Sequence, residues 1–86
     1  MEFNFEKLKP AVKENIFKQL VKDVESNQDF KNDLKEKLNE NEPIHEELFF
    51  ERVNEDGKVY QNNIFLKFEL VNEVVEVSCT RDELPF

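Results

Sequence analysis

The chain contains very little glycine, cysteine, methionine or tryptophan: one glycine, one cysteine, one methionine and no tryptophan in 86 residues. A single glycine is too few for the glycine-rich loop that cradles phosphates. The lone Cys79 cannot form an intramolecular disulfide, as expected for a protein of a reducing compartment. No cysteine–histidine set has the spacing of zinc ligands, so we expect neither a metal nor another cofactor.

Long apolar runs are also missing. Uninterrupted apolar stretches reach three residues at most, so we expect no membrane-spanning segment. Residues 1–6 lack the basic start and apolar run of a secretory signal. Together with the cysteine count, these absences predict a cytoplasmic protein.

Negative charge is abundant and unevenly distributed. Residues 1–39 hold eight acids and eight bases, whereas residues 40–86 hold twelve acids and four bases, so the formal net charge of −8 arises in the second half. Such a chain is repelled by nucleic-acid phosphates and by anionic lipid, so we expect it to bind neither. An acidic half instead favours a surface that meets a basic protein.

Apolar periodicity predicts one domain over residues 1–86, with helices at about 8–38. Leu8, Val12 and Ile16 begin a stripe of apolar residues at four-residue spacing, which indicates an amphipathic helix. Pro10 fits only near the start of that helix. Ser26, followed by Asp29, has the spacing of a cap for a second helix.

The second half predicts a sheet at about 46–81. Its strands are expected at Glu46–Asn54, Lys58–Val71 and Val74–Arg81. The predicted fold is therefore α+β in the order ααβββ, with two N-terminal helices packed on one face of a three-stranded antiparallel β-meander.

The register of the first hairpin decides which residues share a face of the sheet. A three-residue loop with a bulge at Gly57 pairs Asn54 with Lys58 and gathers the most apolar residues on one face, including Phe50. This register places two phenylalanines among glutamates on the other face, which we predict to bind a partner: Glu47, Phe49, Glu51, Phe65, Glu69 and Glu76. The alternative is that this face is only solvated, because acidic residues also keep sheets soluble.

Residues for catalysis are sparse. His45 is the single histidine and has no evident nucleophile beside it, and Cys79 falls on the expected core side of its strand. We therefore expect the protein not to be an enzyme.

The function predicted from these features is that of a small acidic protein which binds and inhibits a basic, nucleic-acid-acting protein. In size, charge and compactness the chain resembles the general type of toxin immunity proteins and of phage anti-defence inhibitors, such as anti-CRISPR and anti-restriction proteins. This is a resemblance of type, carried by no shared motif. The alternative prediction is a homodimeric structural or assembly protein, with a phenylalanine-bearing sheet face or a strand edge as its interface.

Overall fold

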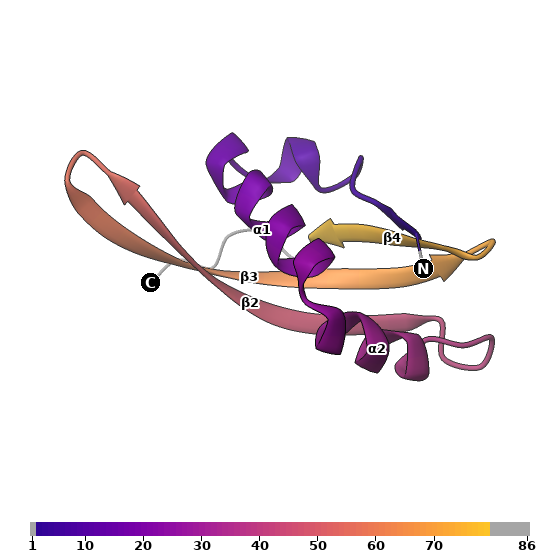
Figure 1. Ribbon diagram of the computed structural model, residues 1–86. Coiled ribbons are helices and arrows are strands. Elements are labelled where there is room, and N and C mark those ends of the chain that lie inside the picture. Colours follow the sequence, from indigo (N-terminus) through magenta and orange to yellow (C-terminus); the bar gives the residue numbers. More distant parts are fainter. Residues whose placement is uncertain (1, 80–86) are drawn as a thin grey trace.

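Residues 2–79, which the computed structural model describes, form two α-helices and a four-stranded sheet (Figure 1). In chain order the elements are β1 (Glu2–Asn4), a 3-10 helix η1 (Lys9–Ala11), α1 (Glu14–Ser26), α2 (Gln28–Lys37), β2 (Ile44–Glu55), β3 (Lys58–Val71) and β4 (Val74–Cys79). The predicted α+β class is confirmed. No helix in the described range combines the length and the apolar content needed to cross a membrane.

The sheet has one strand more than the sequence predicted. Its order is β1-β4-β3-β2, with β2, β3 and β4 forming the expected antiparallel meander. Strand β1 pairs in parallel with β4, with Phe3 opposite Val75, so the sheet is mixed and the prediction of three antiparallel strands is wrong in this detail. A three-residue strand is too short to show a clear alternating pattern, which is why the sequence did not reveal it.

The helices also begin later than predicted. Pro10 lies in η1, after which Val12 and Lys13 are extended, and α1 starts at Glu14. Helix α2 is capped by Asn27, whose side chain accepts a hydrogen bond from the Phe30 amide at 3.0 Å. The predicted cap, Ser26, is instead the last residue of α1.

The first hairpin has a different register from the predicted one. A two-residue turn, Asp56-Gly57, connects β2 and β3, with φ angles of 52° and 75°. Both angles are positive, as a type I′ turn requires, and Glu55 rather than Asn54 lies opposite Lys58. A shift of one residue turns every β2 side chain to the other face of the sheet. The second turn, between Val71 and Val74, has the predicted register.

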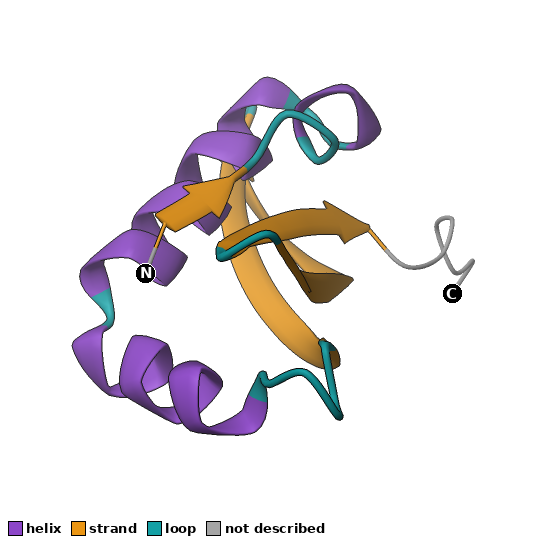
Figure 2. Ribbon diagram, turned by 90° about the vertical axis from the view of Figure 1, so that its right-hand side faces the viewer, coloured by secondary structure: helices purple, strands orange, loops and turns teal. Residues whose placement is uncertain are grey.

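The sheet therefore has two unlike faces, and both helices pack on the same one (Figure 2). We call this the helix-covered face and the opposite one the open face. The helix-covered face includes Glu47, Phe49, Glu51, Val53, Leu66, Phe68, Val75 and Val77. The open face includes Ile44, Leu48, Phe50, Val59, Phe65, Lys67, Glu69 and Glu76.

Phe68 is the centre of the core on the helix-covered face. Its ring lies 5.3 Å from that of Phe30 on α2, 6.2 Å from that of Phe49 on β2 and 6.4 Å from that of Phe3 on β1. A fully buried aromatic or aliphatic side chain of this kind contributes about 1.5–3 kcal/mol relative to an exposed one. This aromatic cluster joins β1, β2 and β3 to α2.

Candidate functional site

The six residues predicted to form one partner-binding surface lie on opposite faces of the sheet. Glu47, Phe49 and Glu51 are on the helix-covered face, whereas Phe65, Glu69 and Glu76 are on the open face. The prediction of a single shared surface is therefore wrong, because the two-residue turn shifts β2 by one position against β3.

Glu51 is the most unusual of the six residues. It is only 3% exposed, and its Oε1 atom has no hydrogen-bond partner in the described part of the chain. Its carboxyl group meets that of Asp23 on α1. Burial first, and then the hydrogen bond and negative charge of Asp23, raise the pKa of Glu51 to about 8. At neutral pH the Glu51 side chain is therefore mostly protonated.

Helix α1 brings Asp23 to this position because of its apolar pattern. Ile16, Leu20 and Val24 are the buried residues of the helix, and Asp23 stands three positions after Leu20 and next to Val24. Side chains at this spacing lie along neighbouring positions of one helix face. Asp23 is therefore half-buried at the edge of the stripe that packs on the sheet.

An open pocket of about 620 Å³ lies beside the carboxyl pair, at the junction of α1 and α2. Phe30 and Phe49 form an aromatic wall, with ring centroids 5.6 Å apart in an edge-to-face arrangement. The complete lining is Asp23, Ser26, Asn27, Gln28, Asp29, Phe30 and Phe49. The pocket thus combines aromatic surface with two carboxyl groups, and Asp23 connects it to the buried Glu51.

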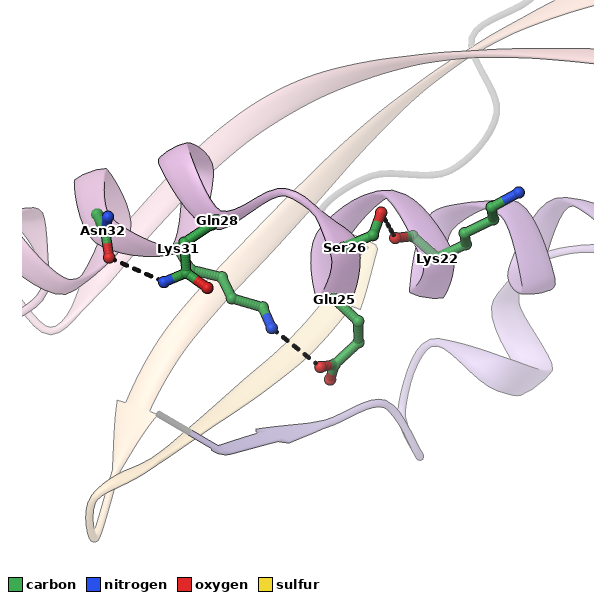
Figure 3. Close-up of polar contacts among 6 residues, drawn as sticks. All are labelled: Lys22, Glu25, Ser26, Gln28, Lys31 and Asn32. Atoms are coloured by element: carbon green, nitrogen blue, oxygen red, sulfur yellow. Dashed lines mark hydrogen bonds and ion pairs between the residues drawn. The ribbon is translucent and has the colours of Figure 1, made fainter.

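The polar contacts around the helix junction use other residues than the pocket acids. Among the described residues, none of these contacts gives the pocket acids a cationic partner. Figure 3 shows Lys31 extended toward Glu25, with 3.3 Å between Nζ and Oε2, and the Ser26 hydroxyl donating to the Lys22 carbonyl. In the described range, no ion pair includes Asp23, Asp29 or Glu51. The pocket therefore presents negative charge that the described residues do not neutralise.

The carboxylates on the open face are in a different situation. Glu69 and Glu76 lie directly opposite each other, as predicted. Lys7 Nζ lies 2.7 Å from Glu76 Oε1, and Lys67 Nζ lies 3.8 Å from Glu69 Oε1. The hydrogen bond with Glu76 and its negative charge raise the pKa of Lys7. These two acids are thus paired with lysines of the same chain, and the open face offers less free negative charge than the sequence suggested.

Other reactive side chains do not gather at the pocket. His45 Nε2 lies 2.9 Å from Glu47 Oε2 on β2, and Cys79 is a half-buried thiol at the end of β4. Within residues 2–79, no group of three or more histidine, cysteine, aspartate or glutamate side chains is arranged to hold a metal ion. The chemistry that the pocket offers is recognition by charge and by aromatic surface.

Sequence reasoning did not identify Asp23, Asp29 or Phe30 as site residues. Asp23 could have been identified from the sequence, because it lies at the edge of a buried apolar stripe. An acid in such a position must either have a polar partner or be protonated. Asp29 and Phe30 could not have been identified as site residues from the sequence, because both are ordinary residues for the first turn of a helix. Only the packing of α2 on β2 brings them to Phe49.

Comparison of the chain with protein-family models, with curated proteins and with solved structures finds no match. Function is therefore inferred from the geometry and charge of the molecule itself.

Proposed function

We propose that this protein binds a basic protein without catalysing a reaction, and that the pocket at the α1–α2 junction receives a lysine or arginine side chain of that partner. One observation carries the proposal: a buried carboxyl group, Glu51, contacts Asp23 beside a pocket that has an aromatic wall and, among the described residues, no cation. A buried carboxyl group with one oxygen that lacks a hydrogen-bond partner, as Glu51 Oε1 does among the described residues, destabilises the fold. Such local conflicts between sequence and fold are typical of functional sites.

A cationic side chain matches each part of the pocket. Its apolar stem packs against the rings of Phe30 and Phe49, and its charged end is attracted by the ring faces and by the carboxylates. Arginine fits particularly well, since its planar guanidinium group donates to a carboxylate through two nitrogens. The pocket acids would then gain the counter-charge that residues 2–79 do not supply.

Binding of a cation would be linked to the release of a proton. A positive charge near Glu51 favours its ionised form and lowers its pKa from about 8. Glu51 would therefore lose its proton when the partner binds at neutral pH. Affinity for the cation is expected to increase as the pH rises from 7 toward 9.

The wider function that we propose is inhibition of a basic protein that acts on nucleic acid. Such proteins expose basic grooves to phosphates, and a formal net charge of −8 attracts these grooves over a distance. Association is expected to be fast and to weaken at high salt. The pocket would supply the specific contact, and the acidic surface the steering.

The pocket can be tested with a small probe, the blocked tripeptide N-acetyl-Gly-Arg-Gly-amide, followed by NMR. We expect chemical-shift changes at Phe30, Phe49 and Asp23 that the matching Gly-Gln-Gly peptide does not cause. Asp23→Asn should remove these changes. Glu36→Gln, which neutralises an exposed acid on α2, should preserve them. Shifts spread over all exposed acids, or unchanged in Asp23→Asn, would contradict a specific cation site.

The inhibitory role needs a second experiment with the whole chain. The wild type is used to capture proteins from a host lysate, alongside Asp23→Asn/Asp29→Asn and the charge-matched control Glu36→Gln/Glu40→Gln. We expect the wild type and the control to retain a basic nucleic-acid-acting protein that high salt releases, and the pocket variant to lose it. The captured protein should then lose activity on nucleic acid when the wild type is added. Equal capture and equal inhibition by both variants would overturn the role of the pocket.

A further inference from the structure

Strand β2 is the last strand of the sheet on the side away from β1. The strand order is β1-β4-β3-β2, so β2 pairs with β3 through one flank, and we call the other its outer flank. This flank is long, because β2 has twelve residues, Ile44–Glu55. Among the described residues, no strand pairs with it. Its outward-pointing N–H and C=O groups can therefore pair with an extended segment of another molecule.

The cation pocket lies beside this outer flank. Of the described residues that line the pocket, Phe49 comes from β2, and the others lie between Asp23 and Phe30. Figure 1 shows the junction of α1 and α2 on the β2 side of the sheet. A strand added to the outer flank would lie about 4.8 Å from β2, with the side chain opposite Phe49 on the helix-covered face. An arginine at that position is placed beside the aromatic wall and the pocket acids.

The charges along the outer flank select the kind of strand that can pair there. Even with Glu51 protonated, the ionised glutamates of β2 outnumber its single arginine, Arg52, by three to one. Charges on an edge strand oppose pairing with strands of like charge. Acids without an ion pair in the described range lie on both sides of the flank: Glu46 on the open face, and Asp23 and Asp29 in the pocket. The flank therefore disfavours a second acidic chain and favours a basic segment.

Apolar side chains lie along the same strand on the open face. Phe50 is 61% exposed and Ile44 is 49% exposed, and Leu48 lies between them, half-buried. β-branched residues of an added strand, opposite Leu48 and Phe50, would cover part of this surface. Since side chains of a strand alternate between the two faces, the matching segment has basic residues toward the pocket and apolar residues between them.

We propose that the outer flank of β2 binds an extended segment of the basic partner as an added strand, with basic and apolar residues in alternation. This inference rests on the proposed function, because one of the basic side chains is the one that enters the pocket. Main-chain hydrogen bonds to β2 supply affinity, and the alternate side chains supply specificity. The partner thus offers an extended tail or an exposed strand, rather than a helix, to this site.

The first test adds the blocked peptide N-acetyl-Thr-Arg-Val-Arg-Val-Arg-Thr-amide to the full chain and follows binding by NMR. We expect it to bind at least about tenfold more tightly than the arginine tripeptide, because main-chain hydrogen bonds add to the contact in the pocket. Hydrogen exchange of the outward-pointing amides between Leu48 and Val53 should become slower. A peptide of the same composition in the order Thr-Arg-Arg-Val-Val-Arg-Thr should lose most of this gain, although its charge is the same.

Methylated forms of the peptide separate strand pairing from attraction by charge. One form carries N-methyl groups on its arginines and the other on its valines, so each blocks the hydrogen bonds of one flank of the peptide. Only one flank of the peptide faces β2. We therefore expect one form to bind about tenfold more weakly and the other to bind like the parent peptide.

A variant of the protein tests the flank without altering the pocket. Glu46→Lys/Phe50→Lys removes the unpaired acid and the exposed ring from the open face of β2. We expect it to weaken binding of the seven-residue peptide about tenfold and to leave binding of the arginine tripeptide unchanged. The control Gln19→Lys/Glu36→Lys makes the same change of charge at exposed positions on the helices, and it should bind both peptides like the wild type.

The possible outcomes distinguish this inference from the proposed function. If the tripeptide binds at the pocket but both methylated peptides bind equally well, or exchange in β2 stays unchanged, the added strand is overturned and the cation pocket stands. If neither peptide shifts Asp23 and Phe49, the pocket and the added strand both fail. Equal weakening by the β2 variant and by its control would attribute binding to net charge alone and would also overturn the added strand.

Discussion

The two faces of the sheet are built from the same strands but differ in which side chains are unfavourably placed. One face buries an acid, and the other exposes apolar residues. The helix-covered face buries the aromatic cluster around Phe68, and with it an acid, Glu51, that lacks a hydrogen-bond partner at its Oε1 atom within the described residues. On the open face, Glu69 and Glu76 pair with lysines, and Phe50 and Val59 are mostly exposed to solvent. Each face thus holds a feature that folding alone does not satisfy: a buried carboxyl group on one face and exposed apolar side chains on the other. Both features suggest that a second molecule takes part.

Adjacent phenylalanines on β2 give the largest expected difference in stability between the two faces. Phe49 packs against Phe30 and Phe68, whereas Phe50 is mostly exposed on the open face. We expect Phe49→Ala to lower the free energy of unfolding by about 3 kcal/mol, and Phe50→Ala to change it by less than about 1 kcal/mol. Urea denaturation of dilute protein measures both. Similar losses in the two variants would show that β2 does not have this register.

Replacement of the buried acid Glu51 should change how the free energy of unfolding depends on pH. The unfolded chain releases the Glu51 proton near pH 4.5, whereas the folded chain retains it to about pH 8. The stability linked to this proton is therefore fully present below pH 4.5 and is lost as the pH rises through 8. We expect Glu51→Gln to remove this loss, and to exceed the wild type in stability by about 1–3 kcal/mol at pH 9.

A matched variant on the open face provides the control for this pH effect. Glu46→Gln removes an exposed acid from the same strand. It should leave the decrease in stability between pH 4.5 and 8 as it is in the wild type. Thermal unfolding across this pH range detects the difference, since 1 kcal/mol moves the melting temperature of a small domain by about 4–8 °C. A Glu46→Gln profile as flat as that of Glu51→Gln would remove the distinction between the two acids.

The two hairpin turns give the smallest expected effect. Both have two positive φ angles, but the second position is Gly57 in one and Glu73, at 71°, in the other. A side chain in this region costs about 1 kcal/mol, so Glu73→Gly should stabilise the fold by about 0.5–1 kcal/mol. Gly57→Ala should destabilise it by a similar amount, although a Cβ there meets no atom within 4 Å. Chemical denaturation of both variants checks the opposite signs.

Much of the fold follows from local patterns that the sequence displays. The stripe of Ile16, Leu20 and Val24 specifies α1, and the strand expected at about Lys58–Val71 coincides with β3. The register of the first hairpin was not predictable in the same way. Either register places two apolar residues of β2 on the core face. A preference for apolar residues in the core favours the register that buries Phe50, because the other register buries Glu51 together with Phe49. The turn chemistry of Asp56-Gly57 decides for the second choice.

The candidate site depended on that register and was therefore misplaced. Three of its six predicted residues, Phe65, Glu69 and Glu76, lie on the open face. Of the others, Phe49 lines the pocket and Glu51 contacts one of its acids, Asp23. The contribution of α2 required the tertiary packing of Phe30 on Phe49, for which no local signal exists. Prediction of a core from the sequence does not place a glutamate there, because burial of a carboxyl group is unfavourable. The burial of Glu51 therefore becomes apparent only from the structure.

The most direct test of this account is the ionisation of Glu51 itself. Carbon-detected NMR of the side-chain carboxyl group, from pH 3 to pH 10, gives its midpoint without any variant. We expect a midpoint near 8, which should fall when the arginine tripeptide is added. A midpoint near 4.5 would show that Glu51 is solvated, and would contradict both the register of β2 and the cation pocket built on it.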